Sequence, residues 1–314
     1  MLDSDGVSFI TNYPDAAPGD GEVRVRVLRA GICDTDLQLI RGYLGFRGVL
    51  GHEFVGVAES GPFAGRRVVG EINCSCGQCA TCRADRRSHC ENRSVLGIRN
   101  HDGAFADFIS VPQQNLHVVP DAIATDAAVF TEPVAAAYRI PAQVEIRPSD
   151  RVAVLGDGRL GNLCAQVLAA LTPHVLVVGK HQKKLDVLKS LGITAALLTD
   201  LPLDATMDVV VDCTGSATGL PTALTLVRPR GTIVLKTTVA GSQTVALAPI
   251  VINEVTVVGS RCGPFDRALA ALADGRVHVA PLISTRFDLA QGLDALETAR
   301  TQPVLKVLLD IAAE

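Results

Sequence analysis

The chain has 314 residues, enough for two domains of roughly 150 residues each, and its 48% hydrophobic and 20% charged residues are typical of a globular protein. Lys and Arg total 29 and Asp and Glu total 33, so the formal net charge is −4. Because no basic run accompanies this charge, we expect neither nucleic acid nor an anionic membrane as a partner. The chain shows no apolar leader and no run of the roughly 18 apolar residues that a membrane span needs, so we expect a cytoplasmic protein.

The first 120 or so residues are predicted to be rich in β-strands. Residues 22–29 alternate charged and apolar side chains, as a half-buried antiparallel strand does. Three more strand-sized segments, separated by Gly or Pro, cover residues 51–60, 66–73 and 106–112. The pattern changes after about residue 125.

A cysteine-rich lobe at residues 74–90 interrupts this β-rich region and holds five of the nine cysteines. Four of them are spaced C-x2-C-x2-C-x7-C, namely Cys76, Cys79, Cys82 and Cys90. Four thiolates this close can surround one tetrahedral zinc and leave it no open position, which predicts a structural metal site. Cys74 is the fifth cysteine and is expected to stand outside the site. A loop of free cysteines is the plainer alternative, but such dense thiols would be prone to oxidation without a metal.

From Asp150 onward, strand and helix patterns alternate. Apolar strands alternate with helices of amphipathic spacing, and the predicted segments are strands 151–155, 174–179, 207–215, 231–237, 254–260 and 303–310 and helices 162–172, 183–192, 219–227 and 264–274. Continuous apolar strands alternating with helices predict an α/β fold with a doubly wound, parallel Rossmann sheet covered on both faces.

A glycine-rich turn joins the first of these strands to its helix. It has the form GxGxxG and comprises Gly156, Asp157, Gly158, Arg159, Leu160 and Gly161. Between a strand and a helix such a turn lets the backbone approach a dinucleotide's pyrophosphate, which faces the helix N-terminus.

Three further motifs occur along the chain: GICDTD (31–36), GHEFVG (51–56) and TEPVAAA (131–137). Together with the cysteine lobe and the glycine-rich turn, and in this order, they resemble the zinc-dependent medium-chain dehydrogenase/reductase family, which includes alcohol and polyol dehydrogenases. The resemblance implies a β-rich, GroES-like catalytic domain over residues 1–135, a Rossmann dinucleotide-binding domain over 136–275, and a return to the catalytic domain over 276–314. Two zinc ions per chain are implied, one catalytic and one structural.

The resemblance also implies which residues perform the chemistry. Cys33, His52 and Glu132 match the ligands of the catalytic zinc, and Glu53 matches a further or alternate ligand. Three protein ligands leave one position for the oxygen of an alcohol or carbonyl substrate, and the metal then acts as a Lewis acid. Thr35 matches the hydroxyl that relays the substrate proton.

Two neighbours of Thr35 refine this expectation. Asp36 matches a carboxylate that orients the ligating histidine, although an acid at a helix N-terminus is the plainer interpretation. Gln38 stands near the position where many relatives carry a histidine as the outer end of the proton relay. Since an amide does not titrate near neutral pH, we expect protons to leave through water or the cofactor ribose.

Cofactor choice is predicted from the end of the second Rossmann strand, about 20 residues after the turn, where an acid usually binds the ribose 2′-hydroxyl. The sequence there is Gly179, Lys180 and His181, with no carboxylate to repel a 2′-phosphate, and Lys184 follows on the helix. We therefore expect NADP(H) to be preferred over NAD(H). By resemblance, Thr214 is a further cofactor contact and Lys306 a weaker one.

The expected activity is hydride transfer between NADP(H) and an alcohol or polyol, or the matching aldehyde or ketone. Two alternatives stay open: an enone or quinone reductase of the zinc-free type, and a nucleotide-binding protein of the same fold without catalysis. The apolar edge strand at 254–260 matches the one through which relatives pair, so a homodimer or homotetramer is expected.

Overall fold

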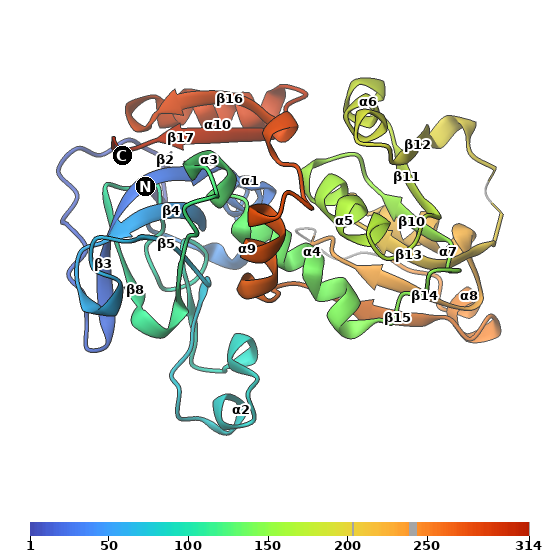
Figure 1. Cartoon of the computed structure of the whole chain (residues 1–314), viewed down its shortest axis with the longest axis horizontal. Coiled ribbons are helices and arrows are strands. Elements are labelled where there is room, and N and C mark those ends of the chain that lie inside the picture. The colour runs from blue at the N-terminus through green and yellow to red at the C-terminus, as the bar shows by residue number, and fades with distance from the viewer. Residues whose placement is uncertain (203, 239–243, 314) are drawn as a thin grey trace. The chain divides into compact units, whose positions relative to one another are not determined.

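The computed structural model divides the chain into two compact units (Figure 1). The first comprises Met1–Glu132 and Ile283–Glu314, and the second Pro133–Leu282. The structure describes residues 1–202, 204–238 and 244–313. The domain limits expected from the sequence lie after residues 135 and 275, and they stay predictions.

The second unit is built on a six-stranded sheet in which every neighbouring pair is parallel. Its order is β12 (Thr194–Leu197), β11 (Val175–Gly179), β10 (Val152–Leu155), β13 (Met207–Asp212), β14 (Val227–Leu235) and β15 (Thr256–Gly259). Along the chain, β10 in the middle of the sheet comes first, β11 and β12 then extend to one edge, and β13, β14 and β15 extend to the other. This order creates a switch point next to β10, and it confirms the predicted doubly wound sheet.

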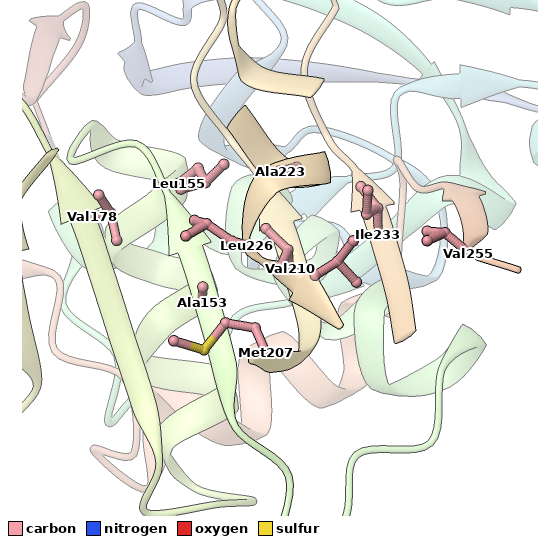
Figure 2. Close-up of a cluster of buried hydrophobic side chains, with 10 residues drawn as sticks. Ala153, Leu155, Val178, Met207, Val210, Ala223, Leu226, Ile233 and Val255 are labelled. Carbon is pink, nitrogen blue, oxygen red and sulfur yellow. The ribbon is translucent and has the colours of Figure 1, made fainter. Parts of the chain in front are cut away.

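Helices connect these strands because parallel neighbours need a crossover. They are α5 (Arg159–Ala169), α6 (Gln182–Ser190), α7 (Gly219–Leu226) and α8 (Ala248–Ile252). Helix α4 (Thr131–Gln143) leads into the unit, and α9 (Phe265–Ala273) follows its last strand. Figure 2 shows how α7 buries Ala223 and Leu226 against apolar side chains of the sheet. Val210 of β13 and Ile233 of β14 are completely shielded from solvent in this cluster. Burial on both faces explains why these strands are continuous apolar runs.

The first unit contains a mainly antiparallel sheet of seven strands. The order is β16 (Ile283–Asp288), β17 (Lys306–Asp310), β3 (Glu22–Gly31), β4 (Glu53–Ala58), β5 (Arg67–Gly70) and β9 (Leu116–Val118), with β8 (Phe108–Pro112) also pairing with β3. Alternate residues of β3 are buried, as its sequence pattern predicts. Strand β17 pairs antiparallel with β3, which returns the C-terminal segment to this unit.

Short elements complete the first unit. They are β1 (Leu2–Asp3), β2 (Gly6–Val7), α1 (Asp34–Ile40), β6 (Asn73–Cys74), α2 (Ala80–Arg83), β7 (Ser94–Val95), α3 (Thr125–Ala128) and α10 (Gly292–Thr301). The cysteine lobe, with α2, lies in the chain between β6 and β7, which pair with each other. Over the part of the chain that the structure describes, no helix combines the length and apolar character required to cross a membrane.

Candidate metal and nucleotide sites

The four spaced cysteines of the lobe converge on one point. The Sγ–Sγ distances are 3.5 Å for Cys79 and Cys82, 3.7 Å for Cys79 and Cys90, and 3.5 Å for Cys90 and Cys76. Ligands about 2.3 Å from a tetrahedral zinc stand about 3.8 Å apart, so these separations fit a four-thiolate metal site. All four cysteines are free thiols rather than disulfides. The lobe therefore has the donor set and the spacing of a closed, structural zinc site.

Local groups already shift the ionisation of these thiols. Backbone N–H groups of Gln78 and Cys79 lower the pKa of the Cys76 thiol to about 6, whereas burial raises the pKa of the Cys82 thiol to about 11. Thiolates are the ligating form, so a bound metal would displace a proton from Cys82. Cys74 lies outside the quartet, and burial raises its pKa to about 12, so it stays a neutral thiol.

A second group of possible metal ligands lies where β3 and β4 meet. Atoms of Cys33, His52 and Glu53 all lie within 4.8 Å of one another. Strand pairing explains their meeting: Gly31 at the end of β3 is directly opposite Glu53 at the start of β4. Cys33 follows β3 closely and His52 precedes β4, so the register of these strands brings the three side chains together. We call this group the Cys33 trio.

Asp36 supports the Cys33 trio from the first turn of α1. Its Oδ2 accepts a hydrogen bond from the backbone N of Cys33 at 2.8 Å, and its Oδ1 lies 3.3 Å from Nδ1 of His52. The cap on α1 is present, whereas Oδ1 stands at ion-pair distance from Nδ1 of His52, and that nitrogen has no hydrogen-bond partner of good geometry. With Nδ1 facing a carboxylate, Nε2 is the nitrogen left to bind a metal.

The charge around His52 also suits a cation. Burial lowers the pKa of His52, but Asp36 and Cys33 raise it by more, so the net pKa lies well above its usual value. The imidazole thus sits among groups that stabilise positive charge. A metal ion can supply that charge in place of the proton.

Glu53 pairs with Lys306, and both side chains are buried. Lys306 Nζ donates to Oε2 of Glu53 and lies 5.3 Å from the ring centroid of Phe130. Burial lowers the pKa of Lys306 to about 8. Oε1 of Glu53 is buried without a hydrogen-bond partner, which is an unstable position for a carboxylate oxygen unless something binds it. A metal held by Cys33 and His52 would satisfy this oxygen.

Two other residues predicted for this site lie at helix starts. Glu132 is in the first turn of α4 and half-buried, and it is not a member of the Cys33 trio. Thr35, also half-buried, is in the first turn of α1, two residues after Cys33. Their proposed roles as ligand and as proton relay stay predictions. Lys306 was a possible cofactor contact by resemblance, but its side chain is buried against Glu53.

The glycine-rich turn of the second unit has the backbone that its sequence predicts. Gly156 has φ = +111°, which side-chain-bearing residues rarely adopt, and a Cβ at Gly161 would overlap the carbonyl oxygen of Gly156. Gly158 is the N-cap of α5, and Arg159 and Leu160 form its first turn. The free N–H groups of this helix start are available to a phosphate.

A cavity of about 110 Å³ lies at the carboxyl ends of β10, β11 and β13. Five residues predicted to bind the cofactor line it, namely Gly156, Gly179, Lys180, His181 and Thr214. Asp157, Leu198, Ser216, Thr218 and Gly219 also line it and were not predicted. Lys184 lies in the first turn of α6 and is half-buried.

One expectation about this cavity is wrong. The space beside Gly179 was expected to hold no carboxylate, but the buried side chain of Asp157 fills it. Oδ2 of Asp157 accepts hydrogen bonds from the backbone N atoms of Lys180 and His181, at 2.7 and 2.6 Å. The acid comes from the glycine-rich turn rather than from the end of β11, and the direction of its side chain could not be deduced from its place in the sequence.

A larger cavity of about 670 Å³ lies in the first unit beneath the N-terminal segment. Tyr13 borders it and donates a hydrogen bond of 2.6 Å to Asp102, which raises the pKa of Tyr13 to about 12. None of the Cys33 trio lines this cavity. Volume alone therefore does not identify the site of chemistry in this unit.

Comparison with known proteins supports the interpretation drawn from the metal sites and the glycine-rich turn. Residues 19–121 match the family model of the alcohol dehydrogenase GroES-like domain, and residues 160–275 match that of the zinc-binding dehydrogenases. A sorbitol dehydrogenase of Halalkalibacterium halodurans is 28% identical over 96% of this chain and 94% of its own. The starvation-sensing protein RspB of Escherichia coli K12 is 30% identical over 89% of this chain and 88% of its own.

Two solved structures resemble the whole chain. The short chain alcohol dehydrogenase RspB of Escherichia coli CFT073, in complex with NADH, is 29% identical with a TM-score of 0.85, over 94% of this chain and 93% of that one. A putative zinc-binding dehydrogenase of Sinorhizobium meliloti 1021, bound to NADP, is 27% identical with a TM-score of 0.84, over the same shares. These similarities support oxidation and reduction of alcohols with a nicotinamide cofactor. The chain belongs to the zinc-dependent alcohol and polyol dehydrogenase branch of the medium-chain dehydrogenase/reductase family.

Proposed function

We propose that this protein transfers a hydride between a nicotinamide dinucleotide and an alcohol or polyol, or the corresponding aldehyde or ketone. The observation that carries the proposal is the Cys33 trio, a thiol, an imidazole and a carboxylate gathered within 4.8 Å in a chain that also has a dinucleotide turn. The sorbitol dehydrogenase relative supports a polyol among the substrates.

The residues that would hold the catalytic metal are Cys33, His52 and a carboxylate. Glu53 has the geometric support, because its Oε1 lies buried without a hydrogen-bond partner, while Glu132 stays the ligand predicted from the resemblance. A zinc ion bound here supplies Lewis acidity toward a substrate oxygen. The second zinc is assigned to Cys76, Cys79, Cys82 and Cys90, where it has no open position.

The chain's own contribution to proton movement is assigned to Thr35. Its Oγ1 would accept the proton that an alcohol loses as the hydride leaves, and would return it in the reverse reaction. Gln38, on the next turn of α1, has no titratable group with which to continue the relay. The proton therefore passes from Thr35 to water or to the cofactor ribose.

Cofactor binding is assigned to the glycine-rich turn and to the cavity beside it. Gly156, Gly158 and Gly161 would allow the backbone to approach the pyrophosphate. Thr214, which lines the cavity with Gly156, stays a predicted cofactor contact. The preference for NADP(H) predicted from the sequence has Lys180, His181 and Lys184 as its support. The buried carboxylate of Asp157 opposes it.

A homodimer or homotetramer stays the expected assembly. Supporting it, β15 pairs only with β14 among the described strands, and Val257 on it is 38% exposed. On the nearby α8, Val251 and Ile252 are 73% and 77% exposed. An open strand edge next to exposed apolar side chains suits pairing with a second copy. The cytoplasmic location stays a prediction.

The test is a screen of activity linked to NAD(H) and NADP(H) over alcohols, polyols, aldehydes and ketones, with zinc measured by mass spectrometry. We expect about two zinc ions per chain, turnover of at least one alcohol, and loss of turnover in Cys33→Ser but not in Cys74→Ser. Reduction of enones that survives removal of the metal would support a zinc-free reductase instead. Nucleotide binding without turnover of any substrate would support the non-catalytic alternative.

A further inference from the structure

Asp157 places a buried carboxylate against the end of β11. Two backbone N–H groups hold its Oδ2, those of Lys180 and His181. A Cβ at Gly179 would overlap this carboxylate, so a residue larger than glycine at that position would displace Asp157. The absence of a side chain at 179 and the acid at 157 are therefore complementary: one makes the space and the other fills it.

Asp157 retains hydrogen-bonding capacity toward the cavity that it lines. Nδ1 of His181 lies 3.1 Å from both carboxylate oxygens, and both backbone N–H bonds go to Oδ2, so Oδ1 has fewer partners than Oδ2. A carboxylate oxygen has two lone pairs, so Oδ1 can accept another hydrogen bond. In a doubly wound sheet the ribose of the adenosine half lies at the carboxyl end of the second strand, and Asp157 is held against that end of β11 by Lys180 and His181.

Resting on the proposed function, we propose that Asp157 reads the 2′ position of the adenosine ribose and makes the chain prefer NAD(H). Its carboxylate accepts a hydrogen bond from the 2′-hydroxyl of NAD(H) and repels the 2′-phosphate of NADP(H). This assignment reverses the preference for NADP(H) expected from the sequence. It makes Asp157 a specificity-determining residue supplied by the turn that also binds the pyrophosphate.

The nearby cations do not cancel this charge. Lys180 is exposed, the side chain of His181 is 56% exposed, and that of Asp157 is 9% exposed. Water screens a charge on an exposed, flexible side chain, whereas a buried charge held by two backbone N–H groups acts at close range in a lower dielectric. The repulsion between Asp157 and a 2′-phosphate therefore outweighs the attraction of Lys180.

Calorimetric titration with NAD⁺ and NADP⁺ tests the assignment without turnover. We expect the unmodified chain to bind NAD⁺ at least about tenfold more tightly than NADP⁺. In Asp157→Asn, the ratio of the two Kd values shifts about tenfold or more toward NADP⁺. A role only in holding the turn would weaken both nucleotides alike and leave the ratio unchanged.

Asp186→Asn is the matched control, because Asp186 is an exposed acid on α6 that bonds Gln182 and does not line the cavity. It should leave the Kd ratio unchanged. Should Asp157→Asn fail to fold, Asp157→Ser gives the same test of the Kd ratio. The Kd values of the unmodified chain for NAD⁺ and NADP⁺ alone decide which nucleotide it prefers. Tighter binding of NADP⁺ than of NAD⁺ by the unmodified chain, or a ratio insensitive to Asp157, overturns the assignment. Failure to bind either nucleotide instead overturns the proposed dehydrogenase function, and this assignment with it.

Discussion

The two metal constellations of the first unit are built in opposite ways. The cysteine lobe draws its four ligands from Cys76 to Cys90, joined by short turns and the one-turn helix α2. The Cys33 trio draws its ligands from the ends of two different strands and depends on the pairing of Gly31 with Glu53. Between Cys76 and Cys90 the buried apolar residues are cysteines, so the lobe needs its metal to hold its shape, whereas strand pairing holds the backbone of the trio. Loss of metal should therefore reduce stability at the lobe and activity at the trio.

The largest expected effect comes from His52→Ala. Losing the imidazole removes the catalytic metal, and kcat/KM should fall about 10³-fold or more, since metal polarisation is worth several kcal/mol of barrier. The control is His117→Ala, a half-buried histidine of β9 that bonds Glu71. Kinetics and zinc content measure both. A loss of activity equally large in His117→Ala would show that the effect is not specific to the site.

The next largest effect is on folding, from Cys90→Ser. Cys90 is fully buried in the quartet, so losing its thiolate should release the lobe metal and lower the free energy of unfolding by about 3 kcal/mol. Denaturant unfolding measures the loss, and kcat/KM of the folded protein should stay within about tenfold of the original. The control is Cys74→Ser, outside the quartet. Equal destabilisation by the two variants would contradict a metal held by the quartet.

A smaller effect distinguishes the two candidate carboxylate ligands. If Glu53 is the third ligand, the double variant Glu53→Gln with Lys306→Met should bind zinc at the trio about 100-fold more weakly. The variant Glu132→Gln should then change the zinc affinity less. The second substitution is needed because Glu53→Gln alone would leave the ammonium of Lys306 buried without its partner. Competition with a chelator measures the affinity. A larger loss in Glu132→Gln would favour the ligand predicted from the resemblance.

The smallest effect is expected from Asp36→Asn. The amide keeps the shape of the side chain but removes the negative charge beside His52, so zinc affinity and kcat/KM should fall about tenfold. Asp34→Asn, at the exposed first position of α1, is the control. Chelator competition and steady-state kinetics measure the two variants. Unchanged affinity in Asp36→Asn would leave Asp36 only its role in capping the helix.

Much of the fold could be predicted from the chain because its elements follow clear periodic patterns. The strand expected at 22–29 is β3, and the helix expected at 183–192 is α6. The sequence did not reveal β16, whose exposed and half-buried residues alternate without a buried apolar face, or α10, which buries only Ala295 and Leu296. It also did not reveal that β17 pairs with β3, because strand partners distant in the chain carry no local signal.

What the sequence by itself determined is what local spacing can encode: four cysteines able to surround one metal, and glycines where the backbone of a dinucleotide turn requires them. Tertiary structure alone decided which side chains meet across distance. Gly31 pairs with Glu53, Lys306 buries its charge against that carboxylate, and Asp157 fills the space beside Gly179. The physical reason is that a side chain's direction and its partners depend on strand register and packing, which the order of residues specifies only through the whole fold.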